Sequence, residues 1–203
     1  MELTPAPGYQ TGIDREWARL AAPGTWWTGA ERVEIAAVAR AARAGVPLPT
    51  TGLAGAAVKA AARLSADPHV DLAWGEGLEQ RGLERPAYVE ILGVVARLDA
   101  VDTFRFGIGA PTRPLPDPRA GEPSRAGVAE AEIDGGFVPT VGPAFPTSAL
   151  SAVAAEQEAQ EELHGVLYMT IEQMGDLEIE LDLGRAQIEF VAARTSLLND
   201  CFF

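Results

Sequence analysis

The sequence predicts an all-α protein. Several alanine-rich segments repeat apolar residues at intervals of three and four, which is the period of a helix. Signals for the start and the end of a helix bound these segments. Alternation of apolar and polar residues, which is typical of a strand, occurs clearly only in residues 177–183, where we expect a short extended connection.

The first expected helices lie before the first dense cluster of prolines. Residues 13–21 form a short amphipathic pattern that ends at a Pro-Gly pair. Residues 26–45 indicate a strong helix, because Thr28 and Glu31 have the spacing of a capping box. Gly45, followed by a proline two residues later, marks the end of this helix.

Three further helices are expected in this half of the chain. Residues 52–66 continue the alanine-rich helical pattern. Asp67 followed by Pro68 has the form of an N-cap with proline at the first helical position, which predicts a helix over residues 69–82. Residues 85–109 are again helical in pattern, with a proline near the start and glycines at the end.

The composition changes after residue 109 and then returns to a helical pattern. Residues 110–147 are rich in proline and glycine, which predicts an extended linker. Residues 148–175 carry a helical apolar stripe, and residues 184–200 predict the last helix. We therefore divide the chain into a helical unit (1–116), a Pro/Gly-rich linker (117–147) and a second unit (148–203).

The overall charge and composition limit the function. The 203 residues carry a formal net charge of −13, which argues against nucleic acid and anionic membrane surfaces as partners. No apolar run approaches the roughly 18 residues of a membrane span, and the first residues lack the pattern of a signal peptide. A single cysteine fits a reducing compartment, most simply the cytoplasm.

Two of the expected helices resemble each other. When Gly29 is aligned with Gly184, Glu34 aligns with Glu189, and both glutamates follow a β-branched residue and lie among apolar positions. This match predicts an internal duplication in which the two helices occupy equivalent places. Chance similarity between two alanine-rich helices remains an alternative, because residues 89–91 repeat the same Val-Glu-Ile tripeptide as residues 33–35.

The end of the chain carries the most specific pattern. Eleven residues separate Glu189 from Cys201, and the segment Ser-Leu-Leu-Asn-Asp-Cys closes this interval. This arrangement resembles the signature of the carboxymuconolactone decarboxylase family, in particular its alkylhydroperoxidase (AhpD-like) branch. The family motif is a glutamate, eleven residues, Cys-x-x-Cys, three residues and a histidine. The second cysteine would fall at position 204 and the histidine at 208, so we expect the 203 residues to stop within the motif.

The first unit resembles the family more loosely. Residues 27–42 are similar to its opening core helix, and residues 83–116 to a later helix with the segment that follows. Neither cysteine nor histidine occupies the motif positions here, and Val46 stands in the place of the first cysteine. The resemblance therefore implies a complete helical unit without the chemistry, followed by the opening of a competent one.

The resemblance implies a dithiol peroxidase in which a glutamate and a histidine deprotonate the attacking second cysteine. The first cysteine then resolves the sulfenic acid into a disulfide, which a lipoyl or thioredoxin-type dithiol reduces. Glu189, between Ile188 and Phe190, would be the base in apolar surroundings, and Cys201 the resolving thiol. The resemblance also implies a homo-oligomer and no cofactor.

Other interpretations remain open. Glu189 also fits a surface carboxylate paired with Arg185, four residues earlier, and Cys201 fits a small buried apolar residue. The same fold would also serve a cysteine-independent lactone decarboxylase, or a non-catalytic scaffold for oligomerisation or binding. With only one thiol, the 203 residues should show little or no dithiol turnover.

Further polar residues do not form a motif. His69 and His164 lie far apart in the sequence and, with one cysteine, provide no zinc spacing. Glu178, Glu180 and Asp182 share one face of an extended segment, for which a solvated acidic edge is the expected role. We expect no metal site.

Overall fold

The computed structural model describes residues 3–4 and 7–199. Within these residues the regular structure is helical, and there is no strand longer than the isolated bridges Glu132–Thr140 and Glu180–Gly184. The all-α class is therefore confirmed. None of the helices in these ranges combines the length and the apolar character that a membrane crossing needs.

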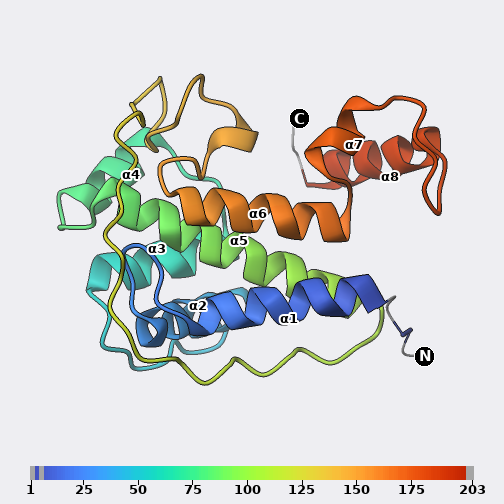
Figure 1. Cartoon of the computed structure of the whole chain (residues 1–203). Coiled ribbons are helices and arrows are strands. Elements are labelled where there is room, and N and C mark those ends of the chain that lie inside the picture. The colour runs from blue at the N-terminus through green and yellow to red at the C-terminus, as the bar shows by residue number, and fades with distance from the viewer. Residues whose placement is uncertain (1–2, 5–6, 200–203) are drawn as a thin grey trace. The chain divides into compact units, whose positions relative to one another are not determined.

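The chain divides into two compact units, residues 1–167 and 168–203, and each is described by itself. In Figure 1 the first unit runs from blue to orange, and the second is red. The α-helices of the first unit are α1 (Pro7–Ala21), α2 (Gly29–Arg43), α3 (Gly55–Ala66), α4 (Leu72–Glu79), α5 (Arg85–Gly107) and α6 (Ala154–Leu167). The second unit contains α7 (Ile171–Gly175) and α8 (Arg185–Leu198).

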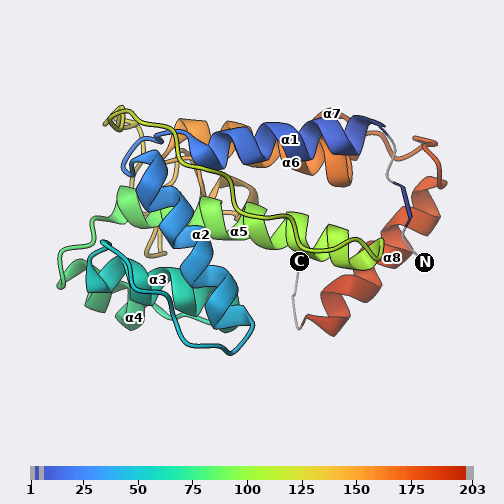
Figure 2. The same ribbon diagram turned by 90° about the horizontal axis from the view of Figure 1, so that it is seen from below.

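The long helix α5 is the centre of the first unit. It packs against α1, α2, α3 and α6, and Figure 2 shows it between the α1–α6 pair and α3. Its apolar side chains point in several directions, so the helix is buried on more than one face. Small side chains let α2 and α3 approach each other closely, and α3 buries the alanines Ala56, Ala57, Ala60 and Ala61.

The predicted helix starts are correct for α2 and wrong for α4. The Thr28 hydroxyl accepts a hydrogen bond from the Glu31 backbone at 3.3 Å, and the Thr28 backbone donates to the Glu31 carboxylate at 2.8 Å. Helix α4 begins at Leu72, where the Asp71 side chain accepts from the Trp74 backbone at 2.8 Å. Asp67 instead ends α3.

The proline-rich segment is packed on the first unit for part of its length. We call residues 110–125 the strap, which runs beside α1 in Figure 1. The indole of Trp17 donates to the Pro114 carbonyl at 2.7 Å, and the Arg119 backbone donates to the Ala21 carbonyl at 2.7 Å. The Ser124 backbone donates to the Gly24 carbonyl at 3.0 Å. The strap thus covers α1 and the α1–α2 connection, although the sequence predicts a plain linker.

Helix α6 belongs to the first unit, whereas the sequence places it in the second. Its residues Ala159 and Leu163 are buried against the first unit, and Glu156 is buried with them. The division therefore falls after Leu167 instead of after residue 147. The predicted long helix over 148–175 is also interrupted, because Thr170 forms a new capping box with Gln173 and starts α7.

Candidate functional site

Glu189 lies in the second turn of α8, on the helix where the sequence predicts it. Its side chain is 50% exposed, so the expected apolar burial of this carboxylate is not found. The Arg185 guanidinium donates to it at 2.7 Å, one turn earlier on the same helix. The ordinary surface ion pair, which was the alternative interpretation of Glu189, is therefore present.

Arg185 also joins the two helices of the second unit. Its guanidinium donates to the backbone carbonyls of Gln173, Met174 and Asp176 at 3.0–3.2 Å, at the end of α7. One side chain thus satisfies free carbonyls of α7 and holds the Glu189 carboxylate at the same time. This contact fixes where the carboxylate lies within the unit.

Tyr168 is a further titratable group beside Glu189 that the sequence motif does not indicate. Partial burial raises the pKa of the Tyr168 phenol, and the nearby Glu189 carboxylate raises it further, while Arg185 opposes the shift. A negative carboxylate disfavours a second negative charge on the phenolate. The candidate site of the second unit is therefore Glu189 with Arg185 and Tyr168 around it.

Cys201, the other predicted site residue, lies outside the described residues. Helix α8 ends at Leu198, and the Asn199 backbone donates to the carbonyls of Thr195 and Ser196. The sequence therefore places the thiol three positions after the last helical residue, on the segment that follows α8.

The positions of the first unit that align with Glu189 and Cys201 have a different role. Glu34, which the predicted duplication pairs with Glu189, lies on α2 and accepts a hydrogen bond from the Gly52 backbone at 3.1 Å. Val46, in the place of the first cysteine, is exposed in the α2–α3 connection. The Glu34 side chain therefore stabilises the turn that precedes α3. The duplication itself stays a prediction.

A second polar cluster lies in the core of the first unit, and sequence reasoning missed it. Arg32 of α2 donates to Glu90 of α5 and, at 2.8 Å, to Glu156 of α6. Arg97 of α5 donates to Glu156 and, at 2.7 Å, to Glu16 of α1. All five side chains are almost completely inaccessible to solvent. We call Glu16, Arg32, Glu90, Arg97 and Glu156 the buried ionic network.

The network contains three carboxylates and two guanidinium groups. Burial raises the pKa of the Glu16 carboxyl despite its contact with Arg97, and burial likewise raises the pKa of Glu90 despite Arg32. Burial also acts on Glu156, but the two arginines together outweigh it and hold its pKa below the ordinary value. Glu156 is therefore the most firmly ionised carboxylate, between both cations.

The surrounding backbone leaves room for this network. A Cβ on Gly24 would collide with the Glu90 carboxylate and the Arg32 guanidinium, and a Cβ on Gly93 would collide with the Glu156 carboxylate. Charged residues inside an otherwise apolar helix, such as Glu90 and Arg97 on α5, are the sequence signal for such a cluster. Each carboxylate is paired with an arginine. We therefore assign to the network the structural role of positioning the helices that it joins.

No metal site is formed by the described residues, among which no three His, Cys, Asp or Glu side chains are grouped suitably. Glu178, Glu180 and Asp182 are exposed in the α7–α8 connection, as the solvated-edge interpretation expects. Comparison of the chain with protein-family models, with curated proteins and with solved structures found no match in any of the three.

Proposed function

We propose that the chain carries part of a thiol-dependent, alkylhydroperoxidase-type peroxide reductase site. The observation that supports this proposal is the interval of eleven residues between Glu189 and Cys201, together with a helix that carries the glutamate and ends three positions before the cysteine. The exposed carboxylate of Glu189 is accessible to a thiol or a peroxide. The buried ionic network takes no part in the reaction.

The reaction requires two thiols. A thiolate attacks the terminal oxygen of a hydroperoxide, the O–O bond breaks, and a sulfenic acid and an alcohol form. A second thiol then condenses with the sulfenic acid, which releases water and forms a disulfide. A lipoyl or thioredoxin-type dithiol, in a reducing compartment such as the cytoplasm, returns both sulfurs to the thiol state.

In this scheme Glu189 acts as the proton acceptor and Cys201 as the resolving thiol. The Arg185 guanidinium donates to the Glu189 carboxylate at 2.7 Å and fixes its orientation. Arg185 is therefore a positioning residue. The 203 residues contain one cysteine, so they can form a sulfenic acid but no internal disulfide, and they support no dithiol cycle.

Peroxide consumption by the 203-residue chain, with excess dithiol reductant, tests this assignment. We expect no sustained turnover, and a single slow oxidation that Cys201→Ser abolishes. Sustained turnover by this chain, lost on Cys201→Ser, would contradict the dithiol scheme.

A designed extension provides the positive test. Adding a segment with cysteine at position 204 and histidine at 208 completes the motif, and we expect this chain to turn over peroxide. Glu189→Gln and Cys201→Ser should each lower its rate at least 100-fold, while Glu178→Gln, an exposed carboxylate of the same unit, should not. Equal rates for Glu189→Gln and the parent would reject the proposed base.

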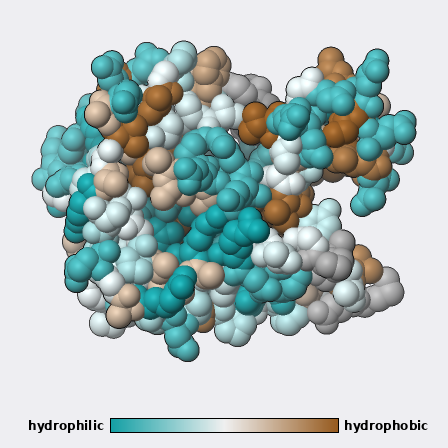
Figure 3. Space-filling view, viewed as in Figure 1, coloured by the Kyte–Doolittle hydropathy of each residue, from teal (hydrophilic) through white to brown (hydrophobic). Residues whose placement is uncertain are grey.

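We also propose that the chain forms homo-oligomers, as the resemblance implies. Helix α8 buries none of its described side chains, and several large apolar residues on it are exposed. Figure 3 shows hydrophobic atoms among hydrophilic ones on the surface of this unit. Apolar surface of this kind favours association, and a monomer in light scattering at micromolar concentration would contradict the proposal. The exposed residues are Phe190, Val191, Leu197 and Leu198.

A further inference from the structure

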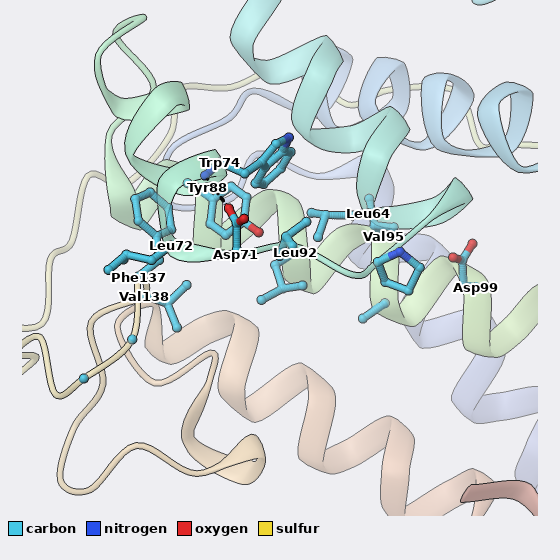
Figure 4. Close-up of a pocket in the computed structure, with 16 residues that line it drawn as sticks. Leu64, Asp71, Leu72, Trp74, Tyr88, Leu92, Val95, Asp99, Phe137 and Val138 are labelled. Atoms are coloured by element: carbon cyan, nitrogen blue, oxygen red, sulfur yellow. Dashed lines mark hydrogen bonds between the residues drawn. The ribbon is translucent and has the colours of Figure 1, made fainter. Parts of the chain in front are cut away.

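The first unit contains an apolar pocket of about 640 Å³. Figure 4 shows it between the end of α3, helix α4, one face of α5 and the loop around Phe137. The volume lies within the range of roughly 300–1,000 Å³ that is usual for small-molecule sites. Aliphatic side chains form part of its wall, among them Leu64, Leu92 and Val95.

Three aromatic rings form the opposite part of the wall. The ring centroids of Trp74 and Tyr88 are 6.0 Å apart, and those of Tyr88 and Phe137 are 5.3 Å apart, both in edge-on geometry. Phe137 is fixed against the backbone of Gly75, where a Cβ would collide with its ring. The Arg85 guanidinium lies 4.9 Å from the Phe137 ring centroid. These protein contacts hold the aromatic wall in place.

The charged groups of the lining are acidic. Asp71 and Asp99 line the pocket, and no lysine, arginine or histidine does so among the described residues. Asp99 is paired with Arg43 at 2.6 Å and with the Ser65 hydroxyl at 3.0 Å. Asp71 caps α4 through one carboxylate oxygen. An anionic ligand would therefore lose water without gaining a cationic partner in the lining.

We propose that this pocket binds a flat aromatic molecule that carries no negative charge. The aromatic wall provides ring contacts, and the aliphatic wall covers the remaining apolar surface. Asp99 is balanced by Arg43, so the Asp71 carboxylate, which forms no ion pair with the described residues, makes the pocket select against acids of the same shape. This site lies entirely in the first unit and does not depend on Glu189 or Cys201.

A matched pair of fluorescent probes tests the proposal. N-phenyl-1-naphthylamine is neutral, and 8-anilino-1-naphthalenesulfonate has the same rings with an added sulfonate. Titration of the 203-residue chain with the neutral probe should give a saturable rise in fluorescence at one site per chain. The sulfonate should bind at least 10-fold more weakly. Absence of saturable binding by the neutral probe, or equal affinity for both, would overturn the proposal.

Two substitutions locate the bound probe. Ala96 is an exposed residue of α5 that lines the pocket. The Phe side chain of Ala96→Phe should fill the pocket and lower the affinity for the neutral probe at least 10-fold. Ala30→Phe is the matched control, because Ala30 is exposed on α2 and does not line the pocket. Both chains should keep the helical circular dichroism spectrum. Unchanged binding by Ala96→Phe would place the probe elsewhere and reject the site.

A third substitution tests the charge selection. Asp71→Asn keeps an oxygen that caps α4 but removes one negative charge from the lining. The affinity ratio between the neutral and the anionic probe should fall by at least 3-fold. An unchanged ratio would reject the role of the Asp71 carboxylate. Cys201→Ser should leave binding of both probes unaltered, which separates this site from the proposed peroxidase chemistry.

Discussion

Arg97 of α5 donates to the Glu156 carboxylate of α6, and both side chains are almost completely buried. The contact joins two residues that are 59 positions apart in the sequence, on different helices. A buried ion pair of this kind stabilises the fold only while both partners are present, because each partner alone is an unpaired buried charge. Removal of one of these charges therefore leaves its partner buried without its counter-ion.

Glu156→Gln should destabilise the first unit by about 3–5 kcal/mol, because it leaves Arg32 and Arg97 without their shared anion. Glu162→Gln on the same helix is the matched control. Glu162 is 46% exposed and pairs with Arg15 and Arg19, so its loss should cost less than about 1 kcal/mol. Urea denaturation at pH 7 measures both values, and equal costs would contradict the importance of the network.

The parent chain and the Glu156→Gln variant should respond differently to acid. The pKa of Glu156 is lowered in the fold, so its stabilising contribution is present above the ordinary carboxyl value of 4.5 and is lost as the pH falls through the lower folded value. The stability difference between the parent and Glu156→Gln should therefore shrink at pH 3. A constant difference between pH 7 and pH 3 would show that ionisation of Glu156 does not account for it.

Gly93→Ala tests the space that the network needs. Alanine favours a helix interior by about 1 kcal/mol over glycine, but here its Cβ would collide with the paired Glu156 carboxylate. We expect a net destabilisation of about 1–3 kcal/mol. Gly77→Ala in α4 is the control, since its Cβ would meet only the flexible end of Arg81. A thermal midpoint raised by both changes would contradict the tight fit around Glu156.

The sequence predicts local structure well in this protein. The capping box at Thr28, the period of the alanine-rich segments and the glycine end of α5 all depend on residues that are neighbours in the chain. The error at Asp67 has a local cause. Its side chain pairs with Arg63 one turn earlier, at 2.9 Å, so a residue with the pattern of an N-cap ends the preceding helix.

The contacts between distant residues could not be predicted in the same way. The strap and α6 join the first unit through Trp17–Pro114 and Arg97–Glu156, and neither pairing leaves a local pattern in the sequence. A proline-rich segment has the sequence pattern of a linker, whether it is free in solvent or packed on a folded unit. In the second unit the motif placed Glu189 on a helix correctly, but its exposure depends on packing that the motif does not encode.

Trypsin should cleave the strap slowly after Arg119, because the Arg119 side chain donates to the Ala18 carbonyl and its backbone to Ala21. Trp17→Phe removes the hydrogen bond to Pro114, which should raise the cleavage rate about 5-fold, as expected for about 1 kcal/mol. Trp26→Phe is the matched control, since the Trp26 indole nitrogen has no hydrogen-bond partner among the described residues. Cleavage of the native chain as fast as in urea would identify the strap as a free linker.

The last prediction concerns Tyr88 in the wall of the apolar pocket. Burial raises the pKa of its phenol from 10.0 to about 12, because the phenolate would lie in an apolar environment. The folded value is above the unfolded one, so the contribution of Tyr88 to stability is complete below pH 10 and is lost as the pH rises through about 12.

Absorbance at 295 nm as a function of pH should show one of the three tyrosines ionising near pH 12. Tyr88→Phe should remove this component, and Tyr9→Phe should leave it. If the chain unfolds in alkali first, Tyr88 should ionise together with the loss of helical circular dichroism. Ionisation of all three tyrosines near pH 10, with the helices intact, would show that Tyr88 is solvated and that the pocket wall is open to water.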